Sequence, residues 1–161
     1  DGVAVDTTDA VSPWTNPFYR LQLQRPAAGS DYTYSPGDCS VGDVDGDGEY
    51  EIIVKWDPSN SKDNSQGGKT GNVYLDCYKF DWSKGGEGVT PQLLWRIDLG
   101  VNIRAGAHYT QFMVYDFDRD GRAEMMCKTA PGSKDGQGNY VLHFQLRKET
   151  AKLNPEHWIG R

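Results

Sequence analysis

The residues best suited to chemistry form two acidic loops with the same spacing. Residues 43–51 read D-V-D-G-D-G-E-Y-E, and residues 116–124 read D-F-D-R-D-G-R-A-E. Both fit the pattern D-x-D-x-D-G-x-x-E, in which alternate carboxylates, a glycine turn and a last carboxylate can surround a hard cation. Calcium is the expected occupant, because it accepts about six to eight oxygen ligands at roughly 2.3–2.6 Å in flexible geometry.

Each loop is expected to supply four side-chain ligands and one main-chain carbonyl. The predicted ligands are Asp43, Asp45, Asp47, Glu51 and the carbonyl of Glu49 in the first loop, and Asp116, Asp118, Asp120, Glu124 and the carbonyl of Arg122 in the second. The alternative is a turn rich in aspartate and glycine that holds no ion. Four converging carboxylates without a cation would repel one another, so the metal site is the favoured interpretation.

The EF-hand, the best-known calcium loop with a similar pattern, does not fit. It places a bidentate glutamate at loop position twelve and lies between two helices. Position twelve is Val54 in the first loop and Cys127 in the second, and the last acidic residue comes at position nine. The segments that follow the loops are short and apolar, which indicates strands rather than helices.

The loops belong to a longer repeat that organises the chain. The acidic pattern recurs after 73 residues (116 minus 43), and the run G-N-V-Y-L is echoed later by G-N-Y-V-L. Strands are predicted at residues 18–23, 51–56, 72–80, 93–99 and 111–115. Short antiparallel strands repeated in this way are typical of β-propeller blades. The prediction is an all-β fold of about two β-propeller blades, incomplete relative to a closed propeller.

The acidity of the chain is concentrated in the loops. The formal net charge is −6 at pH 7, and the two loops contribute eight predicted carboxylate ligands, which leaves the remainder near +2. No basic run of the kind that binds nucleic acid is present, and no apolar stretch approaches the ~18 residues needed to span a membrane. Calcium loops favour an extracellular setting, so we expect a secreted protein. Because the chain starts at Asp1 without a signal peptide, a mature product or an internal piece is expected.

Four runs outside the loops resemble one enzyme family. They are Y-R-L-Q-L-Q-R-P at 19–26, K-W-D-P-S-N-S-K-D-N-S at 55–65, G-N-V-Y-L-D at 71–76 and N-I-R-A-G-A-H-Y-T-Q-F at 102–112. With the loops, they are similar over residues 19–140 to the bacterial rhamnogalacturonan lyases of polysaccharide lyase family 11. The resemblance implies the N-terminal part of a large β-propeller with Ca2+ as cofactor. It also implies β-elimination on the galacturonate–rhamnose backbone of pectin, rhamnogalacturonan I.

The resemblance suggests roles for four polar residues. The reaction needs a base at C5 of the uronate and neutralisation of its carboxylate, for which the family is expected to use calcium or Lys and Arg side chains. Lys55, Arg104 and Lys128 are the catalytic candidates, with the principal base expected outside this chain. The alternatives are solvated strand-end lysines and, for Arg104, a structural ion pair. Asp57 is the candidate substrate-binding residue, with a turn-forming aspartate before Pro58 as the alternative.

Three departures from the family pattern bear on function. The family tends to carry Asn-Asp-Ala where this chain has G-D-C, so Gly37 lacks a side chain that could contact substrate. The tail at 143–161 has no acidic loop and is expected to be helical or disordered, after an N-terminal segment at 1–18 and propeller blades at 19–142. The chain is also short for a closed propeller. The alternative function is therefore a non-catalytic, calcium-stabilised propeller fragment or a carbohydrate-binding module.

Overall fold

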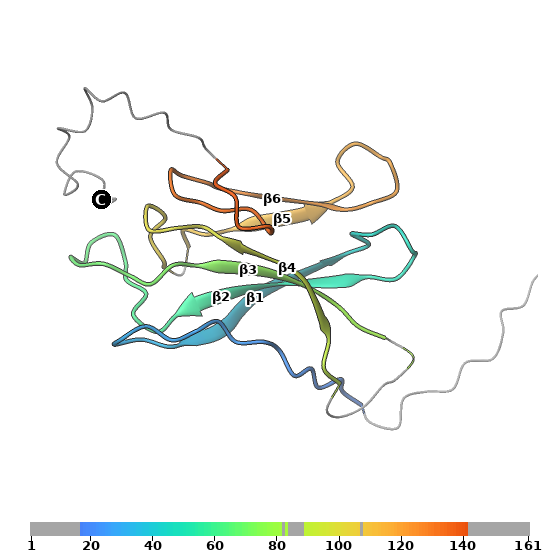
Figure 1. Cartoon of the computed structure of the whole chain (residues 1–161), viewed down its shortest axis with the longest axis horizontal. Helices are drawn as coiled ribbons and strands as arrows, with labels where there is room; N and C mark the ends of the chain where they lie inside the picture. The colour runs from blue at the N-terminus through green and yellow to red at the C-terminus, as the bar shows by residue number, and fades with distance from the viewer. Residues whose placement is uncertain (1–16, 82, 84–88, 107, 142–161) are drawn as a thin grey trace, which may run out of the picture.

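The structure, a computed structural model, describes residues 17–81, 83, 89–106 and 108–141, which form two antiparallel sheets (Figure 1). The strands are β1 (Tyr34–Gly42), β2 (Glu51–Pro58), β3 (Tyr74–Lys79), β4 (Gln92–Asp98), β5 (Phe112–Tyr115) and β6 (Glu124–Cys127). The described residues contain no α-helix, and hence no helix long and apolar enough to cross a bilayer. The predicted all-β class is confirmed.

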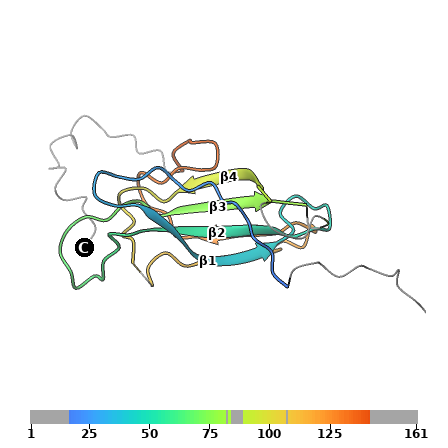
Figure 2. The same ribbon diagram turned by 90° about the horizontal axis from the view of Figure 1, so that it is seen from below.

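The first sheet is a meander of four strands. Each strand pairs antiparallel with the next in the order β1-β2-β3-β4, and Figure 2 shows them side by side. Within it, Ile52 lies opposite Tyr78 and Trp56 opposite Tyr74. The second sheet contains only β5 and β6. Each sheet therefore holds one strand that emerges directly from an acidic loop, β2 from the first and β6 from the second.

The hydrophobic core lies between the two sheets. Val73, Leu75, Leu99, Ile103 and Ala105 are buried in it. The partly buried residues that pack against this cluster come from both sheets and their loops: Ile97, Phe112, Met125, Cys127 and Ala130. Half-buried and exposed residues alternate regularly along β5 and β6, because every second residue faces this core and its neighbours face outward.

The opposite face of the first sheet holds a buried charge that the sequence analysis did not predict. Asp76 is fully buried on β3. Its carboxylate accepts hydrogen bonds from Nε1 of Trp56 at 2.8 Å, from the hydroxyl of Tyr78 at 2.6 Å and from Nε of Arg96 at 2.7 Å. Arg96 also donates to the carbonyl of Gln24 at 2.5 Å, which anchors the preceding segment on this face. Full pairing of this kind lowers the cost of burying a carboxylate.

On the N-terminal side, one predicted strand is wrong and one observed strand was not predicted. Residues 18–23 do not form a strand but only an isolated parallel bridge between Leu21 and Val89. In addition, β1 is absent from the sequence analysis, because its proline and glycine are not typical of strands. Its place at the edge of the sheet, with a register shift between Pro36 and Cys39, tolerates both residues. The other four predicted strands correspond to β2, β3, β4 and β5.

The predicted division of the chain is described only in part. All six strands fall within the predicted blade region at 19–142. Of the predicted N-terminal segment at 1–18 only the last two residues belong to the described residues, and the predicted tail at 143–161 lies outside them. The three-part division therefore stays a prediction.

Candidate functional site

The two acidic loops lie side by side at one end of the molecule. The first connects β1 to β2 and the second connects β5 to β6 (Figure 1). The main-chain N–H of Ala123 in the second loop donates to the carbonyl of Asp43 in the first at 2.7 Å. A Cβ placed on Gly42 would lie 2.7 Å from Cβ of Ala123 and 2.8 Å from Cγ1 of Val114. Gly42 therefore permits the close approach of the two loops.

The two acidic loops form equivalent hydrogen bonds from backbone N–H groups to carboxylates. In each, the first aspartate accepts from the glycine N–H five residues later, and the last glutamate accepts from the N–H that follows the first aspartate. The four bonds are Gly48 N to Asp43 Oδ2 at 2.8 Å, Gly121 N to Asp116 Oδ2 at 3.0 Å, Val44 N to Glu51 Oε2 at 2.8 Å and Phe117 N to Glu124 Oε2 at 2.9 Å. The common pattern thus folds both segments into the same shape.

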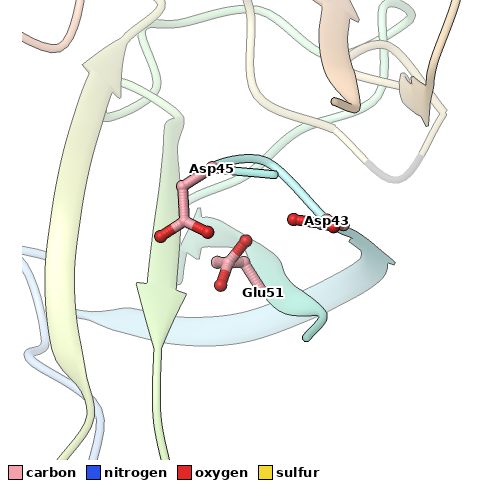
Figure 3. A group of neighbouring side chains, drawn as sticks. All are labelled: Asp43, Asp45 and Glu51. Carbon is pink, nitrogen blue, oxygen red and sulfur yellow. The ribbon is translucent and has the colours of Figure 1, made fainter. Parts of the chain in front are cut away.

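Three of the four predicted side-chain ligands converge in each loop. Ligand atoms of Asp43, Asp45 and Glu51 lie within 4.8 Å of one another, and Figure 3 shows these side chains gathered beside the start of β2. The equivalent group in the second loop is Asp116, Asp118 and Glu124. Both groups could therefore hold a metal ion, as the sequence pattern indicates.

The remaining predicted ligands have other contacts. Asp47 and Asp120 lie outside the two converging groups. Each accepts a hydrogen bond from the main-chain N–H two residues later, that of Glu49 at 2.9 Å and that of Arg122 at 2.8 Å. Their role as ligands, and that of the carbonyls of Glu49 and Arg122, stays a prediction.

The first group fits a cation because two of its oxygens are buried without a hydrogen bond. The side chain of Glu51 is 1% exposed, and neither its Oε1 nor Oδ1 of Asp45 has a hydrogen-bond donor among the described residues. Burial raises the pKa of Glu51, while the N–H of Val44, which donates to the other oxygen, acts against this shift. Buried carboxylate oxygens that lack donors suit a hard cation such as calcium.

One residue of the first site was not predicted from the sequence: Lys79, at the end of β3. Its Nζ lies 2.5 Å from Oδ2 of Asp45 and 3.8 Å from Oε1 of Glu51, and it also donates to Asp47. The hydrogen bond from Lys79 lowers the pKa of Asp47 below its usual range. The sequence carries only a weak signal, a lysine at the end of an apolar strand. The antiparallel pairing of β2 with β3 places it beside Glu51.

Lys55 and Asp57 lie toward the other end of β2. The side chain of Lys55 is 2% exposed, so the alternative of a solvated strand-end lysine is wrong. Its Nζ lies 2.5 Å from Oδ2 of Asp38 and 3.8 Å from Oδ2 of Asp57. Burial raises the pKa of Asp57, and the charge of Lys55 opposes this shift. A Cβ on Gly37 would lie 2.2 Å from Oδ2 of Asp57, so this glycine lets the carboxylate approach the bulge of β1.

Arg104 and Lys128 have different surroundings. Arg104 donates to four main-chain carbonyls of the loop between β2 and β3, those of Lys62, Asp63, Gln66 and Gly68. Its guanidinium therefore acts as a clamp on this loop. Lys128 is exposed and directly follows β6. Among the described residues, no hydrogen bond or ion pair joins either side chain to Lys55 or Asp57. The structure thus brings together two of the four candidates.

Comparison with known sequences identifies the family that shares this arrangement. The family described as "Rhamnogalacturonan lyase family 11, C-terminal domain" matches residues 17–149, which include all six strands and both acidic loops. The chain belongs to rhamnogalacturonan lyase family 11. The resemblance noted from the sequence is confirmed. Because the matching domain is described as C-terminal, the expectation that the chain is an N-terminal part of a propeller is not confirmed.

Two relatives of this family 11 chain come from Bacillus subtilis (strain 168). Rhamnogalacturonan endolyase YesW is 55% identical over 98% of the chain, and rhamnogalacturonan exolyase YesX is 54% identical over 89% of it. The chain covers only 25% of the first protein and 24% of the second. It therefore spans about a quarter of the length of the curated relatives that it matches.

Solved structures of rhamnogalacturonan lyases are similar to this fold. The crystal structure of YesW matches with a TM-score of 0.70 and 57% identity, over 81% of this chain and 22% of that one. The Bacillus licheniformis rhamnogalacturonan lyase PL11 matches with a TM-score of 0.64 and 60% identity, over 74% of this chain and 20% of that one. At such identities the family 11 chain and these lyases have a common fold over the aligned part.

Proposed function

We propose that this chain is part of a calcium-binding rhamnogalacturonan lyase that cleaves the galacturonate–rhamnose backbone of pectin by β-elimination. The observation that supports this most directly is the family match over residues 17–149. The identities of 55% to an endolyase and 54% to an exolyase of rhamnogalacturonan point to the same substrate. Because these two values are nearly equal, they favour neither endo nor exo cleavage.

The proposed reaction makes two demands on a site. A base removes the proton at C5 of the galacturonate, and positive charge neutralises the adjacent carboxylate as the carbanion develops. The bond from C4 to the glycosidic oxygen then breaks, and its electron pair leaves with the oxygen. The products are a hydroxyl on the departing sugar and a uronate with a double bond conjugated to its carboxylate.

The three cationic candidates suit different parts of this task. Nζ of Lys55 is buried and donates to Asp38, so it is suited to electrostatic support of Asp57 rather than to removal of a proton. Arg104 donates its hydrogen bonds to loop carbonyls, which suits it to hold the loop that follows Asp57. Lys128 is exposed at the end of β6 and is the candidate best placed to reach a polysaccharide. The principal base is proposed to lie in the protein beyond this chain.

Cations bound in the acidic loops are proposed to stabilise the fold rather than to take part in the reaction. When bound, calcium supplies positive charge to the loop carboxylates. Glu51 begins β2 and Asp57 lies near its end. Six residues of extended strand separate the two by about 20 Å. A cation at Glu51 is therefore too distant to neutralise a uronate held at Asp57, the proposed substrate-binding residue.

The larger architecture and the setting are part of the same proposal. The two sheets each contain a strand that emerges directly from an acidic loop, which supports the proposal of two incomplete β-propeller blades. A polymeric pectic substrate and a calcium requirement both suit an extracellular location. Neither feature involves nucleic acid or a membrane.

The alternative is a calcium-stabilised fragment or carbohydrate-binding module without catalysis. It is favoured by length, because the chain covers 25% of the endolyase and 24% of the exolyase. It is also favoured by Arg104, whose guanidinium is committed to the main chain. In this case the chain binds rhamnogalacturonan I and does not cleave it.

The ultraviolet absorbance of rhamnogalacturonan I incubated with the chain separates the two functions, because only β-elimination creates an absorbing, unsaturated uronate. A rise that depends on calcium and is lost on chelation supports the lyase. Because the principal base is proposed to lie beyond this chain, the full-length protein is assayed in parallel. A flat trace from both, with binding detected by calorimetry, supports the alternative, and the absence of binding by either contradicts both functions. Asp57→Asn is expected to weaken binding of the polysaccharide, whereas Asp31→Asn, at an exposed aspartate, serves as the matched control.

A further inference from the structure

The ammonium of Lys79 takes the place of a cation in the first acidic loop. Its Nζ lies 2.5 Å from Oδ2 of Asp45 and 3.8 Å from Oε1 of Glu51, and it also donates to Asp47. Asp45 and Glu51 belong to the converging group of candidate ligands. Lys79 reaches them from β3, so this contact also ties the loop to the neighbouring strand of the sheet.

The first loop needs positive charge at this position. The side chain of Glu51 is 1% exposed, and its Oε1 and Oδ1 of Asp45 lack hydrogen-bond donors among the described residues. A carboxylate removed from water in this way is unfavourable unless a cation or donors compensate it. At 3.8 Å, Lys79 lies beyond hydrogen-bond distance of Glu51, so its compensation of this carboxylate is incomplete.

The second loop shows the same sequence pattern without the lysine. Asp118 and Glu124 are exposed and Asp116 is half-buried, so water can solvate all three carboxylates. In the part of the chain that the structure describes, no lysine or arginine forms an ion pair with this group. The two loops therefore differ in their surroundings: an ammonium group lies beside the first group, and the second group is open to solvent.

We infer that Lys79 is an internal counter-ion that a divalent cation must displace in order to enter the first loop. The inference rests on the proposed cation binding by the acidic loops. With the ammonium in place, the first loop keeps its shape without metal, and a bound ion releases Lys79 from the same carboxylates. Calcium therefore fills the second loop first. If Lys79 occupies the first loop about nine-tenths of the time, the apparent dissociation constant there rises about tenfold.

The unmodified 161-residue chain provides the first test. Its lysines are briefly acetylated with acetic anhydride at rising concentrations of calcium chloride, and mass spectrometry measures the modification at each site. Calcium is expected to raise the acetylation of Lys79, because its ammonium leaves the carboxylates, and to leave that of exposed Lys69 unchanged. Calorimetry on the same samples reports whether calcium binds at all.

The outcomes of this test separate the inference from the proposal beneath it. Binding heat accompanied by higher acetylation of Lys79 supports displacement. Binding heat that corresponds to two calcium ions, with unchanged acetylation of Lys79, overturns displacement and leaves the proposed cation sites standing. Absence of binding heat overturns both.

A pair of variants provides the second test. The second loop is disabled by Asp118→Asn, and calorimetry with calcium chloride then compares that chain with the same chain carrying Lys79→Met. The additional change is expected to tighten binding about tenfold, whereas Lys69→Met is expected to leave the affinity unchanged. Unchanged or weaker affinity with Lys79→Met overturns the inference. The labelling of the unmodified chain decides the matter if Lys79→Met does not fold without calcium.

Discussion

The two acidic loops have the same nine-residue pattern and different electrostatic surroundings. Both fold through matching backbone hydrogen bonds, and each gathers two aspartates and a glutamate. Glu51 of the first loop is buried and lies near Lys79, whereas Glu124 of the second is exposed. The difference shows that the pattern determines the shape of a loop, while the adjoining sheet determines how much the loop depends on a bound cation.

The two loops carry different residue types at their fourth position, where the backbone is left-handed. The first has Gly46 there with a φ of 79°, and the second has Arg119 with a φ of 66°. The left-handed region is open to glycine and unfavourable for a residue with a Cβ. The second loop thus carries backbone strain that the first avoids, which adds to its expected dependence on a cation.

The largest effect is expected from calcium at the second loop. At a concentration of about 100 times the dissociation constant, a bound ion stabilises the folded state by roughly 2.7 kcal/mol. Asp118→Ala should remove this increment and change little in the absence of calcium, because the side chain is exposed. Asp45→Ala should lower stability with and without calcium, because Lys79 also loses a partner. Calorimetric melting with calcium or chelator measures both. Equal losses for Asp118→Ala in the two conditions would contradict the calcium assignment.

The next largest effect is a difference in unfolding free energy between variants of the two glutamates, measured without metal. Glu51→Ala is expected to cost about 2 kcal/mol, because it leaves the part-buried N–H of Val44 without its acceptor. Glu124→Ala, at an exposed position, should cost about 0.5 kcal/mol or less. Urea unfolding in the presence of chelator gives both values. Similar losses in the two variants would show that burial of the first site does not separate the loops.

A backbone exchange is expected to have a somewhat smaller effect. Arg119→Gly should stabilise the metal-free chain by about 1 kcal/mol, because it relieves the left-handed strain. Gly46→Ala should destabilise it by a similar amount. The alanine would have to adopt the unfavourable φ, and its Cβ would lie 3.0 Å from Nε of Arg122. Thermal melting under chelation tests both changes. Loss of stability in Arg119→Gly would indicate that the arginine side chain makes a larger contribution than the strain.

The smallest effect concerns the opposite end of the sheet and serves as a reference for the loops. Hydrogen bonds from the main chain of Ser65 and the hydroxyl of Tyr109 lower the pKa of Asp63 to about 2. This value lies below that of the unfolded chain, so the stabilisation is complete above about pH 4 and is lost as the pH falls toward about 2. Asp63→Asn should therefore lower the melting temperature near neutral pH, with a difference that shrinks between these values.

The same variant sharpens the comparison of the two ends. Calcium affinity of both loops should be unchanged by Asp63→Asn, because the residue lies in the loop between β2 and β3. A change in calcium affinity would mean that the two ends of the sheet are coupled. A pH-independent difference in melting temperature would contradict the assigned role of the Asp63 hydrogen bonds.

The sequence predicted local features well because local rules govern them. The acidic pattern predicted two loops with four side-chain ligands each, and three of the four converge in each loop, since glycine turns and alternate aspartates act within nine residues. Short apolar runs and alternating apolar residues predicted β2, β3, β4 and β5. The edge strand β1 escaped prediction, because Pro36 and Gly37 are compatible with a strand only where a bulge and a free edge accept them.

The features missed by the sequence analysis depend on contacts between distant segments. Asp76 is buried because Trp56, Tyr78 and Arg96 meet it from three strands. Lys55 was weighed as a solvated strand-end lysine, yet its side chain is 2% exposed and the bulge of β1 brings Asp38 to it. The spacing of residues within one segment does not predict such contacts between strands.

The sequence by itself therefore determined the all-β class, the family and the shape of the acidic loops, since each follows from residues that are close along the chain. Only the tertiary structure decided which loop receives an internal ammonium and which faces solvent. The physical reason is strand register: the pairing of β2 with β3 sets Lys79 beside Glu51, whereas β6, paired only with β5, leaves Glu124 exposed. Burial then raises the electrostatic cost of the first group and calls for a compensating charge.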